Sequence, residues 1–383
     1  MLLIKNGKIK TMAGADFENG YVLFGDDGKI VAVGEGEVPV CAGEVIDAEG
    51  RLVTPGLVEA HCHLGFWGGP GSGFNENIEP ITPEMRAIDG INPADEAFSL
   101  AVSHGVTSVC TGPGSTNIIG GTFAAIKTVG NRVDNMIIKY PIAMKCALGE
   151  NVNVCFGQDQ KKSPRTKMGI AAMLRELLMK TQNYLQAKES GANPAFNMKL
   201  EAMIPVIKGE IPLKAHAHSA TDIFTIIRIA KEFGVKLTLD HCTDGALIAD
   251  ELAKEGYPAF VGPSFGGKSK KELDNKSFAT AAALYNAGVS VSIVTDAGVT
   301  PIQYLAMFAG FAVNAGLPYE EGWRAITYNP ARDTGIGDRV GSLEVGKDAD
   351  AVIWSADPLT TVGASAVITV IDGRIVYRSE NAE

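Results

Sequence analysis

The chain has 383 residues, of which 46% are hydrophobic and 20% charged, and its formal net charge is −10. This composition is typical of a globular protein and excludes a largely disordered chain. The acidic balance, without a cluster of Lys and Arg, argues against nucleic acid as the main partner. The length is sufficient for a barrel of about 250 residues together with a smaller unit.

The cysteine pattern and the N-terminal stretch point to a protein of the reducing cytoplasm. The six cysteines have no C-x-x-C spacing, and most lie in apolar runs, where a thiol packs as a small hydrophobe. A disulfide framework is not expected in a chain of this length. The stretch MLLIKNGKIKTM has no long apolar segment, so neither a signal peptide nor a membrane span is predicted.

The two ends of the chain share a pattern of short β-like runs separated by tight turns. The runs are LLIKNGKI, YVLFGDDGKIVAVG and EVIDAEGRLVTPG near the N-terminus, and GSLEVGKDADAVIW and AVITVIDGRIVYR near the C-terminus. The NG, DDG and EG steps are typical of such turns. This pattern predicts one composite β-sandwich built from residues 1–55 and 338–383, with residues 56–337 inserted between its two parts.

Residues 56–337 alternate apolar, β-branched runs with helix-like stretches. The expected strands are LVEAHCHL, VTSVCTG, TFAAIKTVG, PIAMKCALG, PLKAHAH, VKLTLDHC, YPAFVG and VSVSIVTDAG. The clearest helix patterns are PADEAFSLAVSH, GIAAMLRELLMKTQNYLQAKE, ATDIFTIIRIAKEFG, DGALIADELAKEG and SFATAAALYNAG. About eight strand–helix repeats favour parallel βα units, and continuous apolar runs fit strands buried on both faces. The prediction is an α/β fold with a TIM-like (β/α)8 barrel, with a doubly wound sheet as the alternative.

Polar residues concentrate at the carboxyl ends of these expected strands, where a barrel places its catalytic groups. Five of the six histidines fall there, and only His104, in the helical AVSHGVT, does not. Because side chains alternate along a strand, His61 and His63 share a face and Cys62 points the other way. The candidate site residues are His61, His63, Lys145, His216, His218, His241 and Asp296.

Imidazoles and carboxylates that converge on one barrel mouth predict a divalent cation. Buried ring nitrogens and carboxylates need partners, and one cation satisfies several of them together. Neutral imidazole and carboxylate suit zinc, manganese or iron. A single HxH motif or a single strand-end aspartate is common in proteins without metal. The prediction of a metal site therefore rests on the occurrence of several such residues at the ends of different strands. The neighbouring thiols of Cys62, Cys146 and Cys242 are expected to pack rather than bind metal.

A glycine-rich segment, GFWGGPGSGFNENIEPITPEMRAIDGINP, follows the first expected barrel strand. Its length and its glycines favour a cover over an active site. A phosphate-binding loop is less favoured, because GGPGSG is not followed by Lys-Ser or Lys-Thr. Phe66, Trp67, Asn75 and Glu76 are candidates to line the pocket, and a surface loop packed on itself is the alternative for each.

Six motifs occur in the order TPGLVEAHCHLG at 54–65, LKAHAHS at 213–219, LDHCTD at 239–244, VTDAG at 294–298, TYNPAR at 327–332 and VGSLEVGKDADAVIW at 340–354. The set resembles the amidohydrolase superfamily, especially its imidazolonepropionase-like and metal-dependent Xaa-Pro and Xaa-Arg dipeptidase-like members. The resemblance spans most of the chain and is specific to the superfamily rather than to a substrate. It implies a distorted (β/α)8 barrel with a composite β-sandwich.

The resemblance also implies a ligand set. His61, His63 and Asp296 would bind one metal ion, and His216 and His241 would bind a second ion in binuclear members.

In those members a fourth-strand lysine, carboxylated by CO2, bridges the two ions, and Lys145 matches it by strand order. Burial of a lysine in an apolar strand is itself unfavourable unless the amine is paired or modified. Glu150 is the alternative ligand, since some relatives use a glutamate there, and imidazolonepropionase-like members bind one ion without the lysine. His218 is expected nearer the mouth, in contact with substrate.

The predicted activity is hydrolysis of a C–N bond, other than a peptide bond, in an amide or cyclic amide. A metal-activated water would attack, Asp296 would act as base and then acid, and His241 or His218 would stabilise the oxyanion. Zinc is the most expected metal, as one or two ions. The alternatives are a dipeptidase, a deaminase of a heterocycle, and a non-catalytic binding relative. The expected partner is a small-molecule substrate, with no nucleic acid or membrane, in a homo-oligomer.

Overall fold

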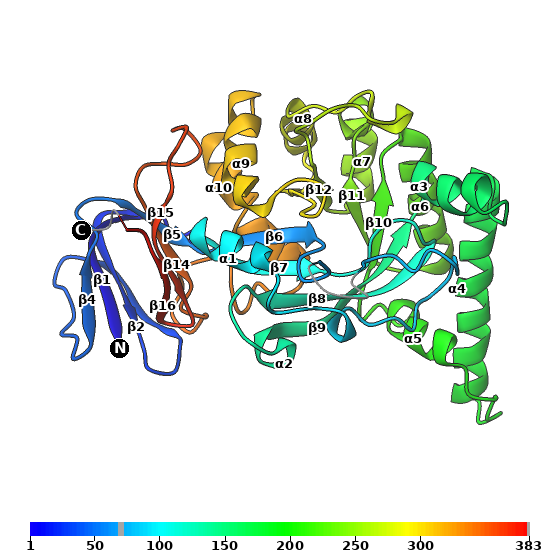
Figure 1. The fold of residues 1–383 in the computed structure, drawn as a ribbon, viewed down its shortest axis with the longest axis horizontal. Helices are drawn as coiled ribbons and strands as arrows, with labels where there is room; N and C mark the ends of the chain where they lie inside the picture. Colours follow the sequence, from blue (N-terminus) through cyan, green and yellow to red (C-terminus); the bar gives the residue numbers. More distant parts are fainter. Residues whose placement is uncertain (68–72, 381–383) are drawn as a thin grey trace.

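The computed structural model describes residues 1–67 and 73–380 (Figure 1). Strands from both ends of the chain form one eight-stranded sheet in the order β16-β15-β14-β5-β1-β2-β3, with β4 paired to β1. The two ends meet where β5 and β14 pair antiparallel, with Val53 opposite Ile353. The strands are β1 (Leu2–Ile9), β2 (Phe17–Phe24), β3 (Ile30–Glu35), β4 (Glu44–Asp47), β5 (Leu52–Pro55), β14 (Ala351–Trp354), β15 (Ala366–Ile371) and β16 (Arg374–Arg378).

This terminal sheet has a hydrophobic core of its own, to which both ends contribute. Ile4 and Phe24 from the N-terminal strands pack in the same buried cluster as Ile353 and Val370 from the C-terminal strands. The shared core explains why two segments more than 280 residues apart fold as one β unit. The arrangement as a two-layer sandwich, with limits at residues 55 and 338, stays a prediction.

A buried group of charges attaches the terminal sheet to the rest of the protein. Lys127 extends its ammonium to Asp350 at 2.6 Å and to Asp348 at 3.0 Å, and all three side chains are almost fully buried. Asp348 also pairs with Arg339 at 2.8 Å. The acidic GKDADAVIW motif therefore has a structural role at this junction, because buried carboxylates require paired cations.

The central sheet runs in the order β13-β12-β11-β10-β9-β8-β7-β6. Its two outermost strands approach each other, since the backbone N–H of His63 after β6 donates to the carbonyl of Ala297 after β13 at 2.8 Å. The sheet is thus a nearly closed barrel, which excludes the doubly wound alternative. Its strands are β6 (Leu57–Cys62), β7 (Val106–Thr111), β8 (Ile119–Lys127), β9 (Ile137–Ala147), β10 (Leu213–Ala217), β11 (Leu237–His241), β12 (Ala259–Val261) and β13 (Val291–Ile293).

One strand departs from the predicted parallel repeat. β8 pairs antiparallel with both β7 and β9, whereas the other neighbours in the barrel are parallel. Only residues 112–118 separate β7 from β8, and residues 128–136, with the short α2 (Val133–Met136), separate β8 from β9. A parallel crossover needs about a dozen residues or more, so these short connections force a reversal of direction. The prediction of eight parallel βα units is wrong for this strand.

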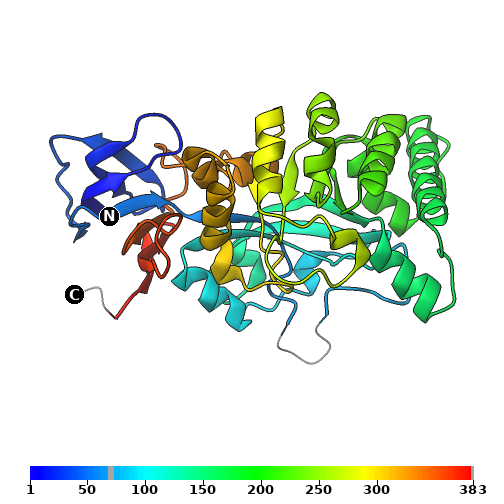
Figure 2. The same cartoon turned by 90° about the horizontal axis from the view of Figure 1, so that it is seen from above.

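The barrel helices cover the outside of the central sheet, and α4 lies at the opposite end of the molecule from the terminal sheet (Figures 1 and 2). The five predicted helices are confirmed. Ser219 caps α6 by accepting from the N–H of Asp222, and the helix ends at Gly234 with a φ of 67°. No helix in the described ranges is both long and apolar enough to cross a membrane. The remaining helices are α1 (Glu96–Ser103), α3 (Glu150–Val152), α4 (Lys167–Glu189), α5 (Met198–Ile207), α6 (Ala220–Phe233), α7 (Ala249–Glu255), α8 (Ala279–Ala287), α9 (Leu305–Asn314), α10 (Tyr319–Arg324) and α11 (Tyr328–Asp333).

Candidate metal centre

The first group of candidate ligands lies where β6 meets the turn after β13. His61, His63 and Asp296 are buried, and their ligand atoms lie within 4.8 Å of one another. Oδ1 of Asp296 is 3.4 Å from Nε2 of His61 and 3.2 Å from Nε2 of His63. Nδ1 of His63 faces the carbonyl of Gly112 at 2.8 Å. A carbonyl only accepts, so Nδ1 carries the proton and Nε2 presents its lone pair toward Asp296.

The backbone around Asp296 is fixed by a buried acid on β6. Asp296 has a φ of 53°, in the left-handed region that a non-glycine residue adopts only when its surroundings hold it there. Thr295 donates to Oε2 of Glu59 from its backbone N–H at 2.8 Å and from its hydroxyl at 2.6 Å. The other oxygen of Glu59 accepts from the N–H of His61 at 3.1 Å. Glu59 thereby ties the His61 strand to the Asp296 turn.

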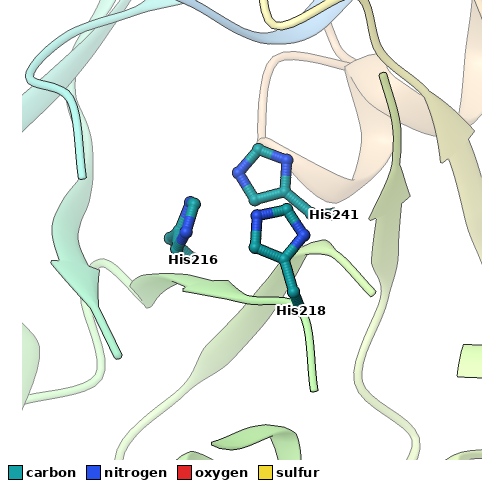
Figure 3. A group of neighbouring side chains, drawn as sticks. All are labelled: His216, His218 and His241. Atoms are coloured by element: carbon teal, nitrogen blue, oxygen red, sulfur yellow. The ribbon is translucent and has the colours of Figure 1, made fainter. Parts of the chain in front are cut away.

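The second group consists of His216 and His218 at the end of β10 and His241 at the end of β11. Figure 3 shows the three rings gathered at neighbouring strand ends, and their ligand atoms lie within 4.8 Å of one another. Nδ1 of His241 faces the carbonyl of Gly262 at 2.7 Å, and Nδ1 of His218 contacts the hydroxyl of Thr243 at 2.7 Å. The His241 ring also lies against that of His61, with centroids 5.2 Å apart, so the two groups are adjacent.

The protonation states suit metal binding. Burial lowers the pKa of His216 and His218 well below the usual value and lowers that of His241 to about 3, so these rings are neutral at pH 7. Burial opposes ionisation of Asp296, but the surrounding His61, His63 and His241 rings hold the pKa of its carboxyl well below the usual value. Neutral imidazoles and a carboxylate are the forms that ligate cations.

Unpaired polar atoms provide the test of whether these residues fit a metal. Both ring nitrogens of His216 and Oδ1 of Asp296 are buried without a hydrogen-bond partner among the described residues. Buried polar atoms are normally satisfied, and a cation bound between these groups would satisfy them together. The nitrogen and oxygen donors match the ligands that zinc takes in hydrolases, so the site fits the predicted metal.

Lys145 lies directly beneath the ligands and is fully buried. Its Nζ donates to Oδ2 of Asp240 at 3.1 Å, while Nζ of Lys214 donates to Oδ1 of the same carboxylate at 2.9 Å. Nδ1 of His61 is 3.2 Å from Oδ2 of Asp240. Carboxylation of Lys145 would remove one of two cations from this carboxylate and leave Lys214 to neutralise it. The bridging role of Lys145 stays a prediction.

The alternative ligand, Glu150, begins α3 at the edge of the mouth, and its backbone N–H donates to Oε2 of Glu272 at 3.0 Å. It belongs to neither of the two ligand groups found in the described ranges.

The prediction that the three neighbouring cysteines pack in the core is confirmed. Cys62, Cys146 and Cys242 lie in the main hydrophobic core, and burial raises the pKa of each thiol. His104 follows α1, where its Nδ1 is 3.0 Å from the carbonyl of Leu100.

Sequence reasoning missed Glu59, Lys214 and Asp240. A signal existed for the first two, since the strand period of two places Glu59 on the face of His61 and Lys214 on that of His216.

The predicted cover is observed in part. Residues 68–72 of its glycine-rich stretch lie outside the described residues. The ring of Phe74, which was not predicted, stacks on His63 with centroids 4.7 Å apart, and Trp67 packs edge-on against Phe74. Phe66 is buried in the main core. Aromatic side chains thus shield His63 from one side.

Asn75 and Glu76, the other two residues predicted to line the pocket, instead form hydrogen bonds that hold the predicted cover against residues 116 and 117. Oδ1 of Asn75 accepts from the N–H of Thr116 at 3.2 Å, and the carbonyl of Glu76 accepts from Nδ2 of Asn117 at 2.7 Å.

Comparison with known proteins identifies the family of this chain. The model of the Amidohydrolase family matches residues 52–376. A crystal structure of an amidohydrolase from Thermotoga maritima MSB8 is 36% identical, covers 99% of this chain and 100% of its own, and has a TM-score of 0.94.

Two curated relatives extend the comparison. An imidazolonepropionase of Bacillus velezensis is 27% identical over 93% of this chain and 89% of its own. The amidohydrolase tasK of Hapsidospora irregularis is 29% identical over 86% of this chain, which spans 37% of that protein's length. The family match covers most of the chain and includes both ligand groups. This protein belongs to the amidohydrolase family of hydrolases.

Proposed function

We propose that this protein hydrolyses the C–N bond of a small amide or cyclic amide, using one or two divalent metal ions held at the two ligand groups. One observation carries the proposal: His216 has two buried, unpaired ring nitrogens beside His218 and His241, next to a group that contains a carboxylate. Zinc is the proposed metal because the donors are imidazole nitrogens and a carboxylate oxygen. The similarity to an imidazolonepropionase supports a cyclic amide over a dipeptide.

A bound cation of this kind supplies a Lewis acid and lowers the pKa of water at the site. Asp296 is anionic at neutral pH and is held between His61 and His63, so its carboxylate can accept a proton from the attacking water. The protonated carboxyl can then pass that proton to the departing nitrogen. The left-handed turn at Asp296 aims the carboxylate into the mouth, and Glu59 holds that turn.

The contacts made by Nδ1 of His218 and by Nδ1 of His241 differ, and they favour different tautomers of the two rings. The Gly262 carbonyl can only accept, so His241 carries its proton on Nδ1 and presents a lone pair on Nε2, which suits ligation. The Thr243 hydroxyl can donate to Nδ1 of His218, which places the proton on Nε2. His218 can then donate from Nε2 to the oxyanion that forms as the carbonyl is attacked. His218 can equally act as a third ligand with the opposite tautomer.

The proposal is tested by metal analysis of the purified protein, followed by assays of the metal-free and zinc-reconstituted forms. The substrate panel contains N-acyl amino acids, dipeptides and cyclic amides. Turnover of an amide by the reconstituted form alone supports the proposal. Ammonia release from aminated heterocycles would replace it with a deaminase function. Tight metal binding with no turnover of either panel would favour a non-catalytic relative. The homo-oligomeric state and the cytoplasmic location stay predictions.

A further inference from the structure

The segment between β12 and α8 lies across the barrel mouth and is anchored there at two points. At the first, Glu272 accepts from the backbone N–H of Glu150 at 3.0 Å and approaches Nε2 of His218 at 3.8 Å. Lys270 pairs with this carboxylate at 2.6 Å and donates to Oδ1 of Asn151 at 2.7 Å. These contacts join the segment to the ends of β9 and β10.

The second anchor is next to Lys276. Nδ2 of Asn275 donates to Oδ1 of Asp244 at 2.7 Å, and Oδ2 of Asp244 accepts from the N–H of Ala220 at 2.9 Å. The backbone N–H of Lys276 itself donates to the carbonyl of Leu273 at 3.0 Å. The backbone of Lys276 is therefore held in place relative to the two groups of ligands.

The Lys276 side chain is half-buried next to the second ligand group. It lines a small cavity together with His241 and Thr243, whose roles at the second ligand group are described above. Burial lowers the pKa of Lys276, the Asp296 carboxylate opposes this change, and Lys270 reinforces it.

Lys276 differs from the other lysines of this segment in having no partner. Lys270 pairs with Glu272, Lys271 pairs with Asp274, and Lys268 donates to the Asp274 carbonyl. Among the described residues, no hydrogen bond or ion pair is found for the Lys276 ammonium. Asp296 does not take this role, because in the described part of the chain its carboxylate lies within ion-pair distance of His61 and His63 but not of Lys276. The Lys276 ammonium is therefore available to a ligand carboxylate that enters the mouth, and such a pair would form a charge-assisted hydrogen bond.

We infer that Lys276 binds a carboxylate of the substrate, so that the protein acts on amides carrying a carboxylate within a few bonds of the scissile C–N bond. N-acyl amino acids, dipeptides and carboxylated lactams belong to this class. The inference rests on the proposed hydrolysis and assigns its specificity. Lys276 would be a specificity residue, since the ligand groups and Asp296 act on the amide itself.

The test compares matched pairs of compounds that differ only in one charge: N-acetyl-L-leucine with its carboxamide, glycyl-L-proline with its carboxamide, and L-5-oxoproline with its carboxamide. Each pair is assayed on the zinc-reconstituted wild type and on Lys276→Met, Lys276→Arg and Lys271→Met. Lys271 is the matched control, because its ammonium belongs to the same segment but its side chain is 90% exposed. Far-UV circular dichroism and the thermal midpoint verify that each variant is folded.

The wild type is expected to favour the carboxylate of each pair roughly ten- to hundred-fold in kcat/KM, the range for a hydrogen bond to a charged group. Lys276→Met should abolish this preference, mainly by raising KM for the carboxylate member of each pair, and should change kcat/KM for the carboxamide much less. Lys276→Arg should retain part of the preference, and Lys271→Met all of it. An undiminished preference in Lys276→Met, or an equal loss for both members of a pair, would overturn the inference.

Calorimetric titration of the same pairs into zinc-loaded protein separates this result from failure of the proposed function. The wild type could bind a carboxylate more tightly than its carboxamide and hydrolyse neither compound. The proposed hydrolysis would then be wrong, and titration of Lys276→Met would still show whether Lys276 binds the carboxylate. If the wild type shows no preference for the carboxylates over their carboxamides in either binding or hydrolysis, the inference about Lys276 is wrong. This holds even if the protein cleaves the carboxamides.

Discussion

Lys145 donates to Asp240 at 3.1 Å in the interior of the barrel, and neither side chain is exposed to solvent. Lys214 donates to the other oxygen of the same carboxylate at 2.9 Å. One carboxylate is therefore the hydrogen-bond acceptor for two buried lysine side chains next to the candidate ligands. The stability of this region depends on that carboxylate, because an unpaired buried ammonium is strongly unfavourable.

Asp240→Asn should destabilise the metal-free protein by about 3–5 kcal/mol, the effect of removing one partner of a buried pair. The measurement is urea denaturation at pH 7. Asp134→Asn is the matched control, because Asp134 pairs with Arg132 on the surface, where loss of an ion pair has little effect on stability. Equal effects of the two substitutions would contradict the role assigned to Asp240.

Asp296→Asn should retain much of the bound metal and lose turnover by roughly 10²- to 10⁴-fold, the usual contribution of general acid–base catalysis. The amide oxygen can still ligate, but the side chain can no longer accept a proton. His63→Ala should instead lose metal and turnover together. Metal content by mass spectrometry, read beside kcat, distinguishes the two outcomes, and near-wild-type kcat in Asp296→Asn would exclude the proton-shuttle role.

His216→Ala should lower the bound metal by about one equivalent, since His216 has no other partner for either ring nitrogen in the described part of the chain. Removal of the metal with a chelator should lower the unfolding midpoint of the wild type more than that of His216→Ala. At a free metal concentration of a hundred times the Kd, binding stabilises the folded state by about 2.7 kcal/mol. His104→Ala serves as the control histidine, and a similar loss of metal in that variant would place the site elsewhere.

Asp348→Asn should reduce the loss of folding stability that the wild type undergoes in acid. Asp348 lies at the junction between the barrel and the terminal sheet. Burial alone would raise the pKa of Asp348, but Arg339, Lys127 and Lys29 hold it at about 2. A carboxyl with a lowered folded-state pKa contributes stability above its unfolded pKa of about 4, and this is lost as pH falls toward 2.

The wild type should therefore lose about 1–2 kcal/mol from this group between pH 4 and pH 2, after allowance for solvent screening, and Asp348→Asn should lose less. Thermal unfolding across this range measures the difference, and parallel curves for the two proteins would refute it.

The sequence by itself determined which residues could form the metal centre. Because strand side chains alternate and parallel barrel strands end at one mouth, the HxH of β6, the histidines of β10 and β11 and Asp296 could be placed together from their strand-end positions. Continuous apolar runs likewise predicted buried strands, and ordered motifs indicated the family. These features are local or follow from a repeated topology, so no contact between distant residues had to be known.

The tertiary structure alone decided the features that depend on contacts between distant segments. The direction of β8 follows from two short connections, although its apolar sequence suits either direction. Asp240 became the partner of Lys145 and Lys214 because three strands converge in the barrel, and Phe74 reached His63 through a segment without a regular pattern. Lys276 is distinguished from the neighbouring lysines only by the tertiary structure, because a sequence shows which residues are charged but not which of them form ion pairs.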